Sequence, residues 1–202
     1  MAIVNGYATL TEIKGRLGIS DAADDAALEA AIEAASRFID GYCGRRFYST
    51  STDETRYYTA WHPGRLLLGD DLLSITTLAT DGDGDRVYEE TWATTDYDLL
   101  PDNAALDGEP YWEITTTPDG GYSFPAGVAK GVKIVGKFGY CLTASPPRAI
   151  VEACLLRATQ VFRLKDVPFA TIGGDGAQTT VSVPVYGMIR DLLGPFRRLG
   201  VG

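Results

Sequence analysis

Three aspartates spaced two residues apart form the densest group of possible metal ligands in the sequence. Asp81, Asp83 and Asp85 match the first, third and fifth positions of an EF-hand calcium loop. Such a loop needs a glycine at its sixth position and a bidentate glutamate at its twelfth. The sequence has Arg86 and Trp92 there, a cation and a side chain without a ligand oxygen. Because β-branched and aromatic residues flank the segment, we expect a tight turn between two strands and no metal site.

Groups suited to catalysis are few. His62 is the only histidine and lies in the turn-like segment "AWHPG", where we expect an exposed side chain rather than a partner for Cys43 or Cys141. The sequence contains no G-x-S-x-G, phosphate loop or dinucleotide fingerprint, and "GGDGAQ" follows a helical segment rather than a strand. We therefore expect no enzyme activity and no cofactor. A hydrolase that uses carboxylates of the central segment is an alternative, which a buried Asp or Glu with a strongly perturbed pKa would favour.

Charge is unevenly distributed along the 202 residues, whose net charge is −9. Residues 148–202 hold seven Lys/Arg and four Asp/Glu, whereas residues 1–147 hold eleven and twenty-three. A chain this acidic is poorly suited to gripping nucleic acid, because contacts between basic side chains and phosphates supply most of that affinity. Its basic C-terminal part suits an acidic protein partner.

Composition is that of a soluble globular protein, with 45% hydrophobic and 22% charged residues. No segment has the character of a signal peptide, and none approaches the roughly 20 apolar residues that a membrane span needs. Cys43, Cys141 and Cys154 are an odd number without C-x-x-C spacing, so we expect buried thiols in a reducing compartment.

Two helices are predicted near the N-terminus. Residues 9–18 begin with Thr9 and Glu12 in the spacing of a capping box and end at Gly18. The second helix starts near Asp25 and stops at Gly44. Its apolar residues recur at steps of three and four, as in an amphipathic helix: Leu28, Ile32, Ala35, Ile39 and Tyr42.

The character changes between residues 48 and 140. Short runs rich in β-branched and aromatic residues alternate with Gly, Pro, Asn and Asp, which predicts six to eight strands. Helical spacing returns in "SPPRAIVEACLLRATQVFRLKD", and "PVYGMIRDLL" predicts a last amphipathic helix that ends at Gly194. Between them, residues 166–183 are Gly-rich and without periodicity, which predicts a mobile loop.

The predicted fold class is therefore α+β: a small bundle of about four helices with a large all-β insertion between the second and third. Residues 1–47 form an N-terminal helical part, 48–140 a β-rich insertion domain, and 141–202 a C-terminal helical part. The helices on either side of the insertion must pack together, because none can bury its apolar face alone.

Several stretches in this order resemble the head–tail connector (adaptor) proteins of tailed bacteriophages and related prophage particles, in a long form with a β insertion. They are "YATLTEIKGRLGISD" and "DDAALEAAIEAASRFIDGYCGRRFY", then "TRYYTA", "LLLGDDLLSITTLATDGDGD" and "VKIVGKFGY". "PPRAIVEACLLRATQVFRLKDVPFA" and "IRDLLGPFRR" complete the resemblance, which covers nearly the whole chain.

This resemblance implies a structural virion protein of the phage neck, assembled in the host cytoplasm. Such proteins form a homo-oligomeric ring, here expected to be a dodecamer, beneath the portal protein, and they extend the DNA channel toward the next neck or tail protein. DNA passes through without sequence-specific binding, and an acidic channel wall would repel its phosphates.

The last helix is the predicted portal anchor, because a Gly-rich segment separates its apolar face from the rest of the chain. Its candidate portal-binding residues are Val185, Ile189, Arg190, Leu192, Leu193, Phe196, Arg197 and Arg198. The alternative is that this helix completes the core of the monomer. Candidate subunit-interface residues lie on the two long helices: Leu28, Ile32, Phe38, Ile150, Leu155 and Phe162.

A second function class is a carbohydrate- or host-surface-binding module. It rests on the aromatic residues of the β region, which can stack on sugars or fill a core. Exposed tryptophans would favour this alternative.

Overall fold

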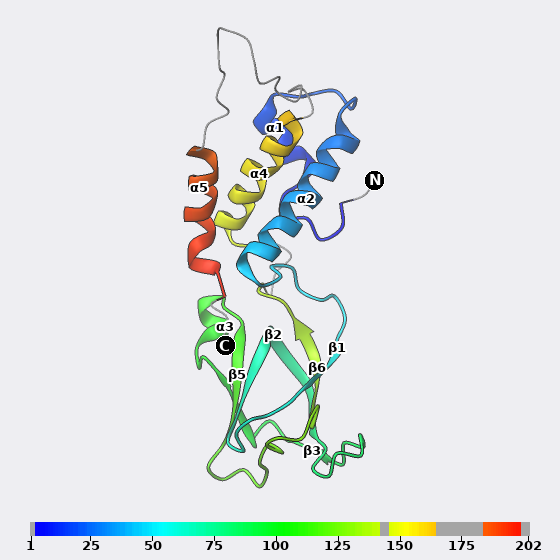
Figure 1. Cartoon of the computed structure of the whole chain (residues 1–202), viewed down its shortest axis with the longest axis vertical. Coiled ribbons are helices and arrows are strands. Elements are labelled where there is room, and N and C mark those ends of the chain that lie inside the picture. Colours follow the sequence, from blue (N-terminus) through cyan, green and yellow to red (C-terminus); the bar gives the residue numbers. More distant parts are fainter. Residues whose placement is uncertain (1–2, 142–145, 165–183, 199–202) are drawn as a thin grey trace, which may run out of the picture. The chain divides into compact units, whose positions relative to one another are not determined.

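The computed structural model describes residues 3–141, 146–164 and 184–198 (Figure 1). The chain forms two compact units, one of residues 1–44 and 146–202 and the other of residues 45–145. The first is helical and the second is built on a sheet. The predicted α+β class, with the β region inserted between the second and third long helices, is confirmed. The predicted loop 166–183 lies outside the described residues.

The helical unit contains α1 (Leu10–Leu17), α2 (Asp25–Cys43), α4 (Arg148–Arg163) and α5 (Pro184–Leu193), followed by the short 3-10 helix η2 (Gly194–Phe196). The predicted capping box is present, because the Glu12 N–H donates to the Thr9 hydroxyl at 3.2 Å and the Thr9 N–H donates to the Glu12 carboxylate at 2.9 Å. Both predicted glycine ends are confirmed, since Gly18 and Gly44 adopt left-handed φ values of 70° and 66°.

Helix α4 is the centre of this unit, because α1, α2 and α5 all pack against it (Figure 1). Its own buried residues lie on a broad face, as the wide apolar stripe of the sequence predicts. Large buried side chains of the bundle come from α1, α2, α4 and α5: Ile13, Leu28, Ile32, Ile39, Ile150, Leu155, Phe162, Ile189 and Leu193.

The second unit is an antiparallel sheet of six strands in the order β1-β6-β2-β5-β4, with β3 paired to β2. The strands are β1 (Glu54–Tyr58), β2 (Arg65–Thr80), β3 (Glu90–Thr91), β4 (Tyr97–Leu100), β5 (Tyr111–Thr116) and β6 (Val132–Phe138). A four-residue helix, α3 (Ala104–Asp107), lies between β4 and β5. Strands β1 and β4 are the two edges of the sheet.

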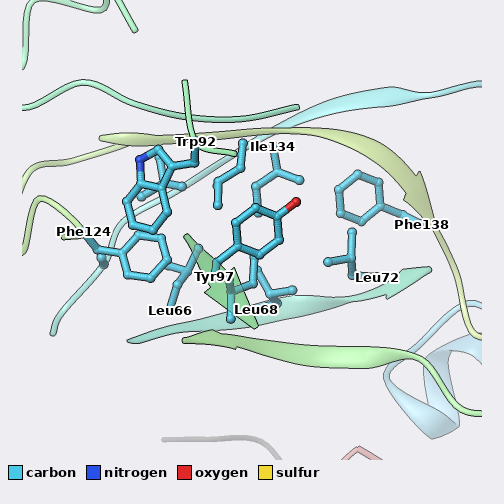
Figure 2. Close-up of a cluster of buried hydrophobic side chains, with 12 residues drawn as sticks. Leu66, Leu68, Leu72, Trp92, Tyr97, Phe124, Ile134 and Phe138 are labelled. Carbon is cyan, nitrogen blue, oxygen red and sulfur yellow. The ribbon is translucent and has the colours of Figure 1, made fainter. Parts of the chain in front are cut away.

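The long strand β2 organises this sheet. Its first part pairs with β5 and its second part with β6, with register shifts between them. Figure 2 shows the resulting core, where Trp92 lies beside Phe124 at one end and Phe138 beside Leu72 at the other, with Tyr97 and Ile134 between them. Each fully buried side chain of this size contributes about 1.5–3 kcal/mol relative to an exposed one. The β unit thus has a hydrophobic core of its own.

Among the described helices, none combines the length and the apolar character needed to cross a bilayer.

Candidate functional site: an arginine–aromatic groove

The turn after β2 brings the three aspartates together, with ligand atoms of Asp81, Asp83 and Asp85 within 4.8 Å of one another. The buried Asp81 carboxylate accepts the backbone N–H of Gly84 at 2.7 Å and that of Arg86 at 2.8 Å. Burial alone would raise the pKa of Asp81, but these backbone donors outweigh it and the pKa is lowered. The carboxylate therefore stabilises the turn from within.

Trp92, which occupies the twelfth position of the aspartate pattern, belongs to the core. Its ring stacks on Phe124 at a centroid distance of 4.6 Å, and its indole N–H donates to the Thr80 hydroxyl at 3.0 Å. Asp83 and Asp85 each accept one backbone N–H of the turn, from Asp85 and Val87 respectively. The spacing of the aspartates is that of an Asx-stabilised turn.

We expect no calcium site with a dissociation constant near or below about 10 μM, because the twelfth-position ligand is missing and the Asp81 oxygens already accept backbone donors. Calorimetric titration of the purified protein measures this. A micromolar site that disappears in Asp83→Ala would contradict the prediction.

The cysteines are buried and form no disulfide among the described residues. Burial raises the pKa of the Cys141 and Cys154 thiols to about 11. The exposed His62 lies in a turn, where its Nδ1 accepts the Gly64 N–H at 3.1 Å. These groups are arranged for packing and turn formation.

A raised pKa keeps a thiol protonated, so at pH 8 only about one Cys141 or Cys154 side chain in a thousand is the reactive thiolate. We therefore expect Ellman's reagent to leave the folded protein almost unlabelled and to label three thiols per chain in denaturant. Fast labelling of the native protein at pH 8 would show that these thiols are accessible.

The structure places five of the six candidate subunit-interface residues inside the helical unit. Leu28, Ile32, Ile150, Leu155 and Phe162 are buried there, so their side chains pack the core of the monomer. Phe38 is half-buried and remains partly available to a partner.

The candidate portal-binding residues divide in the same way. Ile189 and Leu193 are 0% exposed in the helical unit, where α5 packs on α4 and α2. The alternative reading of the last helix, as part of the monomer core, thus accounts for these two residues. Val185, Leu192, Phe196 and Arg198 are half-buried, and Arg190 and Arg197 are exposed.

The segment after α5 is tied to the end of α2. The Arg198 N–H donates to the Cys43 carbonyl at 2.8 Å, just before Gly44 ends α2. This places the basic side chains of residues 190–198 beside the aromatic residues of α2.

A groove of about 680 Å³ lies between the two elements. The guanidinium of Arg197 lies 5.7 Å from the centre of the Tyr42 ring. A hydrogen bond to Tyr42 raises the pKa of Arg190 further above its already high value. The groove is lined by Tyr42, Gly187, Arg190, Asp191, Gly194, Pro195 and Arg197.

Cations and rings alternate beyond the groove. Tyr42 stacks on Phe38 at 6.2 Å, and the guanidinium of Arg157 on α4 lies 4.7 Å from the centre of the Phe38 ring. We call Arg157, Phe38, Tyr42, Arg190 and Arg197 the arginine–aromatic band. Aromatic faces hold guanidinium groups flat by cation–π attraction, and a flat guanidinium can bind a carboxylate through two parallel hydrogen bonds. The band is suited to an acidic protein surface.

The predicted residues Arg190 and Arg197 lie in this band, whereas Tyr42, Phe38 and Arg157 were not predicted as partners of the last helix. The four-residue spacing of Phe38 and Tyr42 on α2 was the signal that could have indicated an aromatic surface there, because residues at that spacing share a helix face.

Residues 7–60, which include α1, α2 and β1, match the family model of the phage gp6-like head-tail connector protein. The resemblance to head–tail connector proteins is confirmed over this segment. No match was found among the curated proteins.

Solved structures show the same fold along the whole chain. A chain from the neck of an empty gene transfer agent (GTA) particle, computed with C6 symmetry, is 21% identical at a TM-score of 0.60. A chain from the neck of the native GTA particle, computed with C12 symmetry, is 20% identical at 0.54. One from the virion of the native GTA particle is 20% identical at 0.58. Each match covers 100% of this chain and 96% of the other.

Proposed function

We propose that the protein is a structural component of the phage neck. It forms a homo-oligomeric adaptor ring that docks under the portal protein, extends the DNA channel and joins the head to the next neck or tail protein. It is assembled in the host cytoplasm and resides in the virion. The observation that carries this proposal is the connector match at residues 7–60, within a chain that shares its full-length fold with GTA neck chains.

Ring formation is supported by the cyclic symmetry of those neck structures, computed with C6 and C12 symmetry. A cyclic ring uses heterologous contacts, so each subunit needs two different complementary faces. A ring of twelve copies is the expected stoichiometry.

Portal docking is assigned to the arginine–aromatic band rather than to the whole apolar face of α5. Ile189 and Leu193 are buried in the helical unit, and Arg190 and Arg197 line the open groove beside Tyr42. An acidic rim on the portal would complement these guanidinium groups and would also guide encounter and orientation.

The net charge of −9 suits a passage for DNA. Negative charge repels phosphates, so DNA can slide through such a ring without being held.

Removal of the gene from the particle that encodes it tests the proposed role. We expect heads that contain the portal and packaged DNA but carry no tail, and tails again when the protein is supplied separately. Normal tailed particles in its absence would contradict an adaptor role.

A carbohydrate- or host-surface-binding module is the second candidate, and one observation favours it. Trp61 is 85% exposed and Trp112 is 45% exposed, although Trp92 is buried in the core. Exposed indole rings can stack on sugars. If this function holds, the wild-type protein binds host cell-wall glycans and Trp61→Ala weakens that binding while tail attachment continues; no glycan binding by the wild-type protein eliminates it.

The pKa shifts of Asp81 and Glu152 do not favour the hydrolase alternative. Asp81 is buried, but its pKa is lowered, and the pKa of Glu152 is lowered by a hydrogen bond from Arg16. A general acid requires the opposite direction.

A further inference from the structure

A second basic and aromatic site lies on the β unit, at the edge strand β1. The pocket has a volume of about 250 Å³ and is lined by Tyr57, Arg86, Tyr88 and Lys130. The Tyr57 and Tyr88 rings lie 5.7 Å apart, and the Lys133 ammonium is 4.9 Å from the centre of the Tyr88 ring. Tyr57 is 49% exposed, so the aromatic floor faces solvent.

Two of its basic residues have an unusual backbone. Arg86 and Lys130 adopt φ values of +76° and +56°, in the left-handed region that residues other than glycine rarely occupy. Hydrogen bonds hold both in place, since the Arg86 N–H donates to Asp81, the Lys130 N–H donates to Thr59 at 3.0 Å, and the Tyr88 hydroxyl donates to the Lys130 carbonyl at 2.7 Å. Strained positions that surrounding contacts fix in this way concentrate at binding sites.

The chemistry of the pocket selects a carboxylate. Arg86, Lys130 and Lys133 provide three cations beside two tyrosine rings. Extended DNA is a poor occupant, because residues 45–145 hold eight Lys/Arg against sixteen Asp/Glu and would repel a run of phosphates. A few carboxylates on a protein surface match the site without that cost.

The other edge of the same sheet carries such carboxylates. Asp98 lies on β4, and Asp102, Asp107 and Glu109 follow it around α3. All four are exposed, and none forms an ion pair within the part of the chain that the structure describes. The apolar Leu106 among them is 86% exposed. A basic aromatic edge and an acidic edge are thus present on one subunit.

We propose that the pocket at the β1 edge of one copy binds carboxylates of the β4 edge of a neighbouring copy, so that the β units join head to tail. This inference rests on the proposed ring, which requires two complementary faces on each subunit. The occupant is a second copy of this chain, and of these four carboxylates Asp98 lies on β4 and Asp102 is the first to follow it.

Charge reversal tests the pairing in ring assembly on the portal, followed by mass photometry. We expect Lys130→Glu to weaken assembly at least tenfold, and Asp98→Lys with Asp102→Lys to do the same. Because the reversed charges at positions 130, 98 and 102 attract one another again, the triple variant should recover part of the lost assembly. Lys137→Glu is the matched control, since this exposed lysine on β6 lies outside the pocket and makes the same change in charge.

Disulfide trapping supplies an independent readout. A chain with Lys130→Cys and Asp98→Cys forms a ladder of covalent oligomers on oxidation, whereas either single variant stops at dimers or monomers. The native cysteines do not interfere, because they are buried.

Assembly of the wild-type protein distinguishes a failure of the proposed function from a failure of the proposed pairing. Failure of the wild-type protein to form a ring on the portal overturns the proposed function and this inference together. Normal assembly of Lys130→Glu, or a wild-type ring in which positions 130 and 98 form no cross-link, overturns the pairing alone. Loss of DNA retention without loss of assembly in Lys130→Glu would assign the pocket to DNA and also overturn it.

Discussion

Replacing Leu193 with alanine is expected to destabilise the helical unit by about 2–5 kcal/mol, the usual cost of a cavity left by a truncated buried leucine. Leu193 is 0% exposed and sits at the end of α5, where the helix packs on α4 and α2. Urea unfolding followed by the helical circular dichroism signal measures the loss, and the signal of the helices is used because the two units can unfold separately.

Met188 provides the matched control on the same helix. It is 54% exposed, so Met188→Ala should change the free energy of unfolding by no more than about 0.5 kcal/mol. If Leu193→Ala is equally silent in stability but no longer joins the portal, the last helix is a docking element and its burial in the monomer does not contribute to folding.

Reversing the charge of Arg190 and Arg197 together is expected to weaken binding to the portal by about 30-fold to 1,000-fold, the range of residues at the centre of an interface. Both line the groove beside Tyr42, and neither is needed to fill the core. Unfolding in urea should therefore match wild type. Binding should also weaken as salt is raised, because the contacts of exposed charges are screened.

Two further variants separate charge from shape. Arg163→Glu reverses the charge of one exposed arginine on α4 outside the groove, as each of the two substitutions does inside it, and should leave binding within about threefold of wild type. A Cβ at Gly187 meets nothing within 4 Å, so a side chain can start there, and Gly187→Leu should occupy the groove and block the portal as effectively as charge reversal. If the double arginine variant and Gly187→Leu both bind the portal as tightly as the wild-type protein does, the portal contact lies outside this groove.

Local signals in the sequence predicted most of the fold. The T-x-x-E spacing of Thr9 and Glu12, and the glycines at 18 and 44, mark helix ends by backbone chemistry that needs no distant partner. The last helix also has its predicted bounds, Pro184–Leu193. The turn residues between strands likewise indicated an all-β region between the long helices.

The candidate site was harder to predict because burial depends on what packs against a helix. An apolar stripe has the same spacing whether it faces the monomer core or a partner. The sequence alone therefore could not show that Ile189 and Leu193 are buried against α4 and α2 rather than available to the portal. The arginine–aromatic band joins α2, α4 and α5, so its contacts span sequence separations that no local pattern encodes.

Electron microscopy of the full-length protein mixed with its portal gives the plainest test of the adaptor role. We expect a closed ring of copies of this chain, coaxial with the portal and bound to the end from which a tail would extend, with an open central channel. In the reconstruction, the groove lined by Arg190 and Arg197 should face the portal. Particles in which the portal remains bare at micromolar protein, or in which the chain decorates only the outer surface, would contradict the adaptor role.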